Sequence, residues 1–156
     1  MRVSDALASS TIVIRPAWGS FDDTIAGLVD QLVAAGRLPR QRGQAAATRI
    51  REREAMASTA MVDIGVSIPH ARLDGVNGIV AAIAVSPGAV YQVADGLPIS
   101  IVALVLSSLS LSGDHLNFLS ALSMLLQSAR FRDRLRHAAT PDEVLQLIRA
   151  NEQARG

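Results

Sequence analysis

Two long apolar runs dominate the pattern of hydrophobic and polar positions, at residues 79–85 and 99–106. Both have the length of a strand, and they do not alternate with polar residues as a strand with one solvated face would. A β-branched run at 11–14 predicts a further strand, and the segment 89–93 between two turns predicts another. Strands that are apolar on both sides need cover on both faces. The pattern therefore predicts an α/β fold with helices on either side of a sheet.

Apolar residues recur at helical spacing in the segments between and after these runs. Ser20 is the expected N-cap of the first helix, which Gly36 ends, and residues 41–56 are rich in helix-forming Ala, Arg, Glu and Gln. Three more helices are expected in the last third of the chain. They are a helix capped by Ser112 or Asp114 and running to 126, a short helix at 131–138, and a helix that opens at Thr140-Pro141.

Length and composition narrow the class of protein. The 156 residues are expected to form one domain, 1–156, since they show no repeat and no linker. No apolar run approaches the roughly 20 residues that cross a bilayer, and no export signal is seen, so we expect no membrane insertion and a cytoplasmic location. The net charge of +1 and the aromatic content of 3% argue against a nucleic-acid partner. The absence of cysteine excludes disulfides and thiolate metal sites.

The sequence Ile68-Pro69-His70-Ala71-Arg72 carries the first candidate for chemistry. Pro69 lacks an N–H and restricts Ile68 to the extended region, so we predict that a strand ends at Pro69 and that His70 lies in the loop after it. Imidazole can act as a neutral nucleophile near pH 7, and loops at strand ends hold the sites of open α/β sheets. Taken alone, these residues leave a turn with an incidental histidine as the commoner alternative.

His115 is the second candidate, in the first turn of the helix that begins near Ser112. The positive end of the helix dipole disfavours an imidazolium there, so the ring should be neutral and able to donate to an oxyanion. The helix expected at 41–56 carries Arg49, Arg51 and Arg53, and their spacing does not tell which of them faces His70. A nucleophilic imidazole, a donor imidazole and a guanidinium are the parts that phosphoryl transfer needs. The alternative for His115 is an ordinary helix residue.

Other chemistries find less support in the sequence. His137 lies at a helix C-terminus, where the dipole stabilises a cation, and it is assigned no role. The three histidines include no closely spaced ligand pair, so no metal is expected. A serine nucleophile would need a Gly-x-Ser-x-Gly turn, which the sequence lacks. A histidine-dependent hydrolase would need a further acid or base that the sequence does not indicate.

The order of these motifs resembles one protein family over nearly the whole chain. The motifs are Arg53-Glu54, then Ser58-Thr59, then Gly65-Val66-Ser67-Ile68-Pro69-His70-Ala71-Arg72, then Asp95-Gly96-Leu97-Pro98-Ile99, then His115-Leu116 at the start of a leucine-rich helix. The series resembles the enzyme IIA domain of the phosphoenolpyruvate-dependent sugar phosphotransferase system, in its fructose/mannitol and nitrogen-regulatory family. This resemblance implies a single-domain mixed β-sheet flanked by helices on both faces, as in mannitol-type enzyme IIA.

The resemblance also implies an activity and the residues that carry it. His70 would be the histidine that is transiently phosphorylated, His115 the second active-site histidine, and Arg53 the arginine that supports the phosphate. No cofactor and no metal are implied. The donor would be an HPr-type phosphocarrier protein and the acceptor an enzyme IIB or a regulatory target, and a homo-oligomer is left open. A separate domain with no membrane segment favours a nitrogen-branch regulator slightly over a sugar permease subunit.

One loop departs from the family pattern and keeps a second hypothesis open. Where the family usually reads Gly-Ser-Thr-Gly, this chain has Ala57-Ser58-Thr59-Ala60, and the following segment 61–65 is one residue longer. Fewer glycines leave less freedom for positive φ and for close approach of the backbone to a phosphate. The alternative is an interaction module with the same fold that is not phosphorylated. The phosphocarrier hypothesis requires His70 and His115 to lie close enough to share one phosphate.

Overall fold

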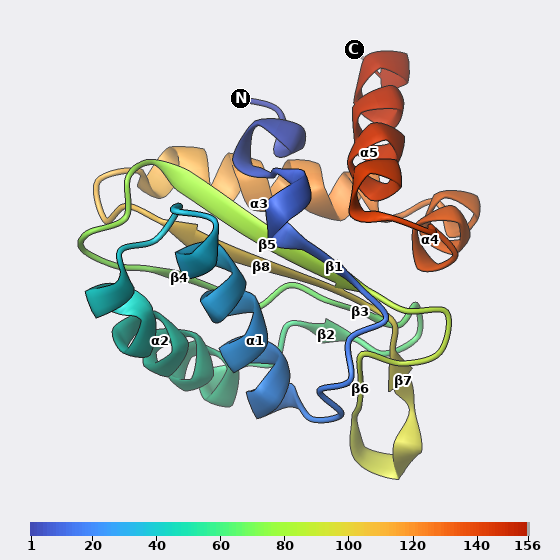
Figure 1. Ribbon diagram of the computed structural model, residues 1–156, viewed down its shortest axis with the longest axis horizontal. Coiled ribbons are helices and arrows are strands. Elements are labelled where there is room, and N and C mark those ends of the chain that lie inside the picture. The colour runs from blue at the N-terminus through green and yellow to red at the C-terminus, as the bar shows by residue number, and fades with distance from the viewer. Residues whose placement is uncertain (156) are drawn as a thin grey trace.

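The computed structural model describes residues 1–155 as a central sheet between two layers of helices (Figure 1). The helices are α1 (Phe21–Ala34), α2 (Gly43–Met56), α3 (Ser112–Leu125), α4 (Ala129–Arg136) and α5 (Pro141–Arg155), with short 3-10 helices η1 (Val3–Ala6), η2 (Ser9–Thr11), η3 (Arg40–Arg42) and η4 (Ala94–Gly96). The strands are β1 (Ile12–Ile14), β2 (Ala60–Met61), β3 (Val66–Ser67), β4 (His70–Arg72), β5 (Ile79–Val85), β6 (Tyr91–Gln92), β7 (Pro98–Ile99) and β8 (Ile101–Ser107). None of the helices in this described range is long and apolar enough to span a bilayer.

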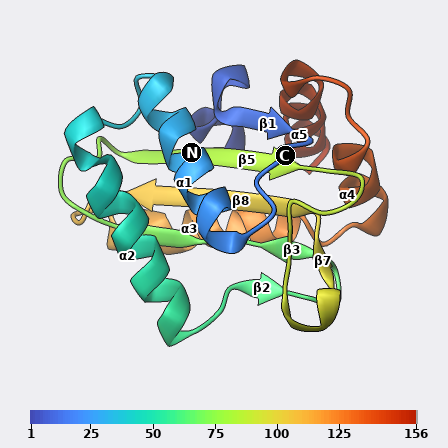
Figure 2. The ribbon, with the colours of Figure 1, turned by 60° about the horizontal axis from the view of Figure 1, so that its bottom comes forward.

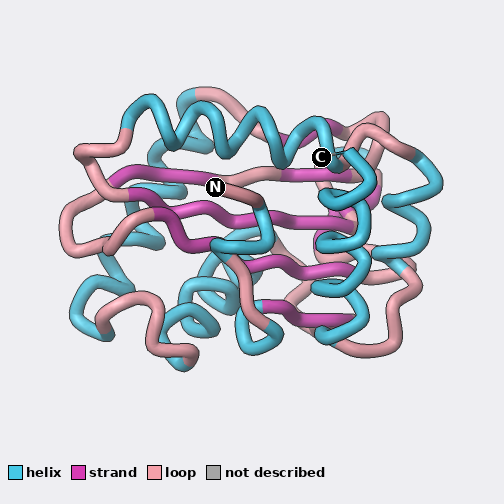
Figure 3. The backbone as a smooth tube through the Cα atoms, turned by 90° about the horizontal axis from the view of Figure 1, so that it is seen from above, coloured by secondary structure: helices cyan, strands magenta, loops and turns pink. Residues whose placement is uncertain are grey.

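The main sheet is mixed, with strands in the order β1-β5-β8-β3-β2 (Figure 2). β5 runs antiparallel to β8, whereas β1 is parallel to β5. β3 and β4 are both parallel to β8 and follow one another along the same side of it. The strands run side by side across the molecule (Figure 3). Because β4 pairs only with β8 among the described strands, it forms an edge of the sheet.

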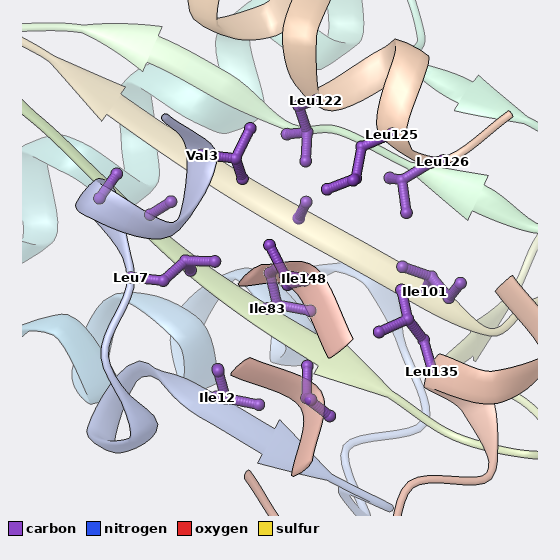
Figure 4. Close-up of a cluster of buried hydrophobic side chains, with 14 of the residues drawn as sticks. Val3, Leu7, Ile12, Ile83, Ile101, Leu122, Leu125, Leu126, Leu135 and Ile148 are labelled. Atoms are coloured by element: carbon purple, nitrogen blue, oxygen red, sulfur yellow. The ribbon is translucent and has the colours of Figure 1, made fainter. Parts of the chain in front are cut away.

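The two long apolar strands, β5 and β8, are buried along their whole length. Successive side chains of a strand point to opposite faces, and each face builds its own core. Ile83 and Val105 belong to the core with η1, α3, α4 and α5, part of which is shown in Figure 4. Ala82 and Leu104 belong to the core with α1 and α2. Burial on both faces thus confirms the prediction of helices on either side of the sheet.

The predicted helices all form, and two of the three predicted N-caps are correct. Thr140 caps α5, since its Oγ1 accepts the backbone N–H of Glu143 at 3.1 Å. Ser20 caps α1, since its Oγ accepts the backbone N–H of Asp23 at 3.1 Å. The prediction that Ser112 or Asp114 caps α3 is wrong. The N-cap is Leu111, and no side chain caps this helix. The Ser112 hydroxyl lies one position into the helix and accepts instead from an arginine on β4.

The prediction that His70 lies in a loop is also wrong, because the chain does not leave the sheet at Pro69. β3 ends at Ser67, and His70 begins β4 after two residues outside the ladder. The register along β8 is continuous across this break, with Ser67 opposite Val102 and His70 opposite Val105. The carbonyl of Pro69 still accepts the N–H of Val105 at 3.0 Å. Proline thus interrupts the strand without turning the chain away.

The apolar run predicted as one strand at 99–106 is divided at Ser100. Ile99 pairs with Tyr91 in the separate β6–β7 hairpin, whereas Ile101 starts β8 in the main sheet. Ser100 lies between the two sheets and donates its backbone N–H to the carbonyl of Gly65 at 2.8 Å. The apolar pattern does not distinguish two successive buried strands from one.

Candidate active site

A hollow of about 360 Å³ lies over the edge strand β4, between α2 and α3. Three segments that are far apart in the sequence contribute two histidines and three arginines to it, together with apolar side chains. The lining residues are Arg49, Arg53, His70, Ala71, Arg72, Leu109, His115, Leu116 and Leu119. A larger hollow of about 480 Å³ between η1, α3 and α5 contains no histidine. The structure therefore brings together the three residues singled out from the sequence, His70, His115 and Arg53.

His70 has one ring nitrogen bonded and the other open. Its Nδ1 lies 2.8 Å from the carbonyl oxygen of Ile68. A carbonyl can only accept, so Nδ1 carries the proton of the neutral ring and Nε2 holds the lone pair. Nε2 makes no hydrogen bond to any of residues 1–155, and the side chain is only partly buried. A neutral imidazole in this state can act as a nucleophile.

His115 lies next to His70, with the two ring centroids 5.4 Å apart and the ring planes at 54°. It is 6% exposed. Burial, together with the charges of His70 and Arg72, lowers the pKa of His115 to about 4. The ring is therefore neutral at pH 7, as the sequence predicts, although burial rather than the helix dipole is the main cause.

Ser107, the last residue of β8, is a site residue that the sequence reasoning missed. It is fully buried, and its Oγ lies 2.5 Å from Nδ1 of His115. When this hydroxyl donates to Nδ1, the proton of the neutral His115 ring resides on Nε2. The only signal in the sequence was a hydroxyl at the end of an apolar strand. The two imidazoles then have opposite states, with a lone pair on Nε2 of His70 and an N–H on Nε2 of His115.

The arginines of α2 divide between two sides of the helix. Arg49 and Arg53, one turn apart, line the hollow, and each donates to a backbone carbonyl at 3.3 Å. Arg51 lies away from the hollow and forms an ion pair with Asp22, with Nε 3.4 Å from the carboxylate. The structure thus selects two of the three arginines that the sequence left open.

Arg72 also lines the hollow, and the sequence reasoning assigned it no role. It stands two residues after His70 on β4, and residues two apart on a strand share a face. Its Nη1 donates to Ser112 Oγ at 2.7 Å and to the Leu109 carbonyl at 3.3 Å. The i, i+2 spacing would have revealed it had β4 been predicted as a strand.

His137 lies outside this site. It is the C-cap of α4, and its Nδ1 donates to the Asp133 carbonyl at 2.9 Å. Over the part of the chain that the structure describes, no three histidine or carboxylate side chains gather as metal ligands would. The chemistry available in the hollow is that of imidazole and guanidinium groups, which suits an anion such as a phosphoryl group.

The loop that departs from the family pattern forms the β2–β3 hairpin beside the site. Glu54 anchors it, because its carboxylate accepts the Thr59 backbone N–H and hydroxyl, both at 2.8 Å, and the Ser58 hydroxyl at 3.0 Å. Neither alanine that replaces a glycine adopts positive φ; Ala57 is extended at −159°. The backbone of this chain therefore does not need the missing glycines.

Sequence comparisons find relatives with consistent names. The family described as phosphoenolpyruvate-dependent sugar phosphotransferase system, EIIA 2, matches residues 6–151. The nitrogen regulatory protein of Pseudomonas aeruginosa is 30% identical over 117 residues, which cover 74% of this chain and 75% of that protein. The fructose-specific EIIA component of Haloferax volcanii is 34% identical over 122 residues, covering 78% and 77%. The fructose-specific EIIABC component of Bacillus subtilis is 29% identical over 98% of this chain, which spans only 24% of that protein's length.

Solved structures agree with the fold described above. The nitrogen regulatory protein IIA-Ntr from Neisseria meningitidis superposes with a TM-score of 0.79 at 24% identity, covering 94% of this chain and 98% of that one. Enzyme IIAMTL from Escherichia coli, solved in complex with phosphorylated enzyme IIBMTL, gives a TM-score of 0.73 at 19% identity, covering 92% of this chain and 97% of that one. At these identities the structures establish the similarity of the fold.

Proposed function

This chain belongs to the EIIA 2 family of the phosphoenolpyruvate-dependent sugar phosphotransferase system, and on that basis we propose that it carries a phosphoryl group on His70. The observation that most supports this proposal is the pair of imidazoles, 5.4 Å apart in a hollow lined by three arginines. A phosphoryl group on one ring would lie within hydrogen-bonding reach of the other. No carboxylate lines this hollow among the described residues, so no negatively charged side chain there would repel an anion.

In the proposed step, Nε2 of His70 attacks the phosphorus of a phosphohistidine on the donor protein. A nitrogen–phosphorus bond forms at Nε2 while the one on the donor breaks, and its electron pair stays with the donor imidazole. Nδ1 keeps its proton, which stays hydrogen-bonded to the Ile68 carbonyl. The step therefore balances without water and without the gain or loss of a proton. The phosphorylated ring is then cationic, which makes it a good leaving group for the onward transfer.

The other groups of the hollow stabilise the charge that moves in this step. Neutral His115 donates from Nε2 to a phosphoryl oxygen, and it adds no positive charge that would repel the phosphorylated His70 ring. Arg53, together with Arg49 and Arg72 in the same hollow, offsets the negative charge of the phosphoryl oxygens. Donors placed in this way are typically worth about 10²- to 10³-fold in rate.

We further propose that the donor is an HPr-type phosphocarrier protein and that the acceptor is an enzyme IIB or a regulatory target. Two relatives are named as fructose-specific EIIA or EIIABC components and one as a nitrogen regulatory protein. The neighbouring structure from Escherichia coli contains an enzyme IIA bound to phosphorylated enzyme IIB. These names support both kinds of acceptor.

The test is incubation with phosphoenolpyruvate, enzyme I and a panel of HPr-type proteins, followed by intact mass measurement and an acid-lability assay. We expect an acid-labile gain of one phosphoryl group in the wild-type protein and in His137→Ala. His70→Ala should show no gain, and His115→Gln a gain slowed by about 10²-fold.

Failure of the wild-type protein to accept a phosphoryl group from any donor would refute the proposal. The chain would then be better described as an interaction module with this fold. A gain that persists in His70→Ala would place the phosphoryl group on another residue.

A further inference from the structure

Four arginines form one continuous surface that starts in the hollow and extends beyond it. Arg42 is the N-cap of α2, and Arg49 and Arg53 lie on the helix. Their spacings of seven and four residues place the three along one side of the helix over about 16 Å. Arg72 adds a fourth from β4, which lies beside α2 (Figure 1). Arg42 and Arg49 also line a smaller adjoining hollow of about 160 Å³. These four residues are called the arginine face below.

The guanidinium groups of this face are oriented by backbone carbonyls rather than by acids. Arg42 donates from Nε to the Asp74 carbonyl at 2.9 Å, and Arg49 donates from Nη2 to the Arg72 carbonyl at 3.3 Å. A guanidinium has five N–H donors, so each keeps most of them for another partner. Donors that are already oriented lose less entropy when they bind.

Negative charge is scarce around the arginine face. Within residues 1–155, none of its four arginines forms a salt bridge; those that form involve Arg51, Arg136 and His137. Among the residues that the structure describes, Asp74 is the one carboxylate that lines either hollow. Of the two acids on α2, Glu54 accepts hydrogen bonds from Ser58 and Thr59, and exposed Glu52 lines neither hollow. The face therefore carries an excess of positive charge, although the whole chain has a net charge of only +1.

Apolar side chains border the arginine face on the side of α3. Leu116 is 64% exposed and Leu109 is 44% exposed, and both line the hollow that holds His70. Exposed apolar side chains rimmed by polar groups mark interaction sites, and arginine is enriched at protein interfaces. In the described part of the chain, no phenylalanine, tyrosine or tryptophan, on which nucleic-acid bases would stack, lines either hollow.

We propose that the arginine face is a docking surface for an acidic face of the protein that exchanges a phosphoryl group with His70. The proposal rests on the proposed function for the exchange and adds the chemistry of the partner. Carboxylates of the partner meet Arg42 and Arg49, and an apolar patch of the partner covers Leu109 and Leu116. The charge excess speeds encounter and sets the orientation in which the partner's histidine reaches His70.

The test measures binding of acidic peptide without any phosphoryl transfer. Hexaglutamate, hexalysine and hexathymidylate are titrated into the ¹⁵N-labelled protein at low and at physiological salt, and chemical shifts are followed. We expect hexaglutamate to shift resonances of the arginine face and its neighbours, with binding weakened by salt. Arg49→Glu should weaken this binding about tenfold. Arg149→Glu, an equal charge change on α5 at the opposite side of the sheet, should leave it unchanged.

A second measurement uses phosphoryl transfer from each HPr-type donor that phosphorylates the wild-type protein. Arg42→Glu should raise KM about tenfold with little change in kcat, because Arg42 lines only the adjoining hollow and the change alters docking and not the reacting groups. Diffuse shifts, shifts confined to another surface, or tighter binding of hexathymidylate would overturn the proposed acidic protein partner. If no donor phosphorylates the wild-type protein, the proposed function fails, and the peptide titration still decides whether the face binds acidic protein segments.

Discussion

Arg72 on β4 donates from Nη1 to Ser112 Oγ on α3 at 2.7 Å. This bond joins the strand that bears His70 to the helix that bears His115, within three residues of each ring. The same Nη1 donates to the Leu109 carbonyl in the loop that leads to α3. This cross-link acts beside the Ser107–His115 hydrogen bond in fixing the separation of the two imidazoles.

Two substitutions distinguish the effect of the cross-link from the effect of the charge of Arg72. Ser112→Ala removes the accepting hydroxyl but keeps the guanidinium, so we expect phosphoryl transfer to slow by about tenfold while the pKa of His115 stays near 4. Arg72→Gln removes both, so transfer should slow further and the pKa of His115 should rise. NMR titration of His115 and single-turnover transfer measure the two effects. An unchanged pKa in Arg72→Gln would contradict the assignment.

His115 should make the folded protein sensitive to acid. Its pKa is about 4 when folded, against 6.5 for an ordinary histidine, so the unfolded chain binds the proton more readily. The stability that depends on neutral His115 is then complete above pH 6.5 and decreases as the pH falls from 6.5 to 4. Over this range we expect the wild-type protein to lose about 2 to 3 kcal/mol more than His115→Gln. Urea unfolding at several pH values measures the difference, and exposed His137→Gln should follow the wild type.

Glu54 should hold the β2–β3 hairpin in place. Its carboxylate accepts three hydrogen bonds from Ser58 and Thr59, and Glu54→Ala leaves these donors to solvent. We expect a loss of about 1 to 2 kcal/mol in the free energy of unfolding. Hydrogen exchange should also be faster at residues 58–67. Glu52→Ala, an exposed position two residues earlier on α2, is the control and should change neither quantity.

Two helical glycines should respond in opposite ways to a methyl group. A Cβ on Gly27 would clash with the Trp18 ring, so Gly27→Ala must displace the indole from α1 and should cost about 1 to 3 kcal/mol. A Cβ on Gly113 meets nothing within 4 Å, and Gly113→Ala should be neutral or stabilising by up to about 1 kcal/mol. Thermal unfolding of both variants, with Trp18 fluorescence for the first, provides the measurement. Equal effects would contradict the close contact at Gly27.

The fold was predictable wherever local patterns decide the outcome. The strand Ile79–Val85 forms with the bounds that its apolar run predicts, because turns at Asn77-Gly78 and Pro87-Gly88 delimit it. The failures come where a neighbouring strand decides. Pro69 is a local stop signal, but β8 extends alongside and the chain rejoins it at His70. Ser100 carries no stop signal, yet the chain changes sheets there.

The residues of the candidate site were likewise predictable only where local sequence motifs identify them. His70, His115 and Arg53 were singled out because motif order marks them, and they do line one hollow. Ser107 and Arg72 were missed because their importance depends on which residues lie opposite each other. These two are register partners on β8 and β4, a relationship that the sequence does not contain. The choice between Arg49, Arg51 and Arg53 likewise needed the rotation of α2 about its axis.

The interruption of the strand at Ile68-Pro69 has a chemical consequence for the ring that follows it. In an unbroken ladder, the Ile68 carbonyl would be available to a neighbouring strand, whereas here it accepts the Nδ1 proton of His70. That bond selects one tautomer and leaves the lone pair on Nε2. Pro69, which has no amide proton to donate, thereby determines which ring nitrogen of His70 carries the proton.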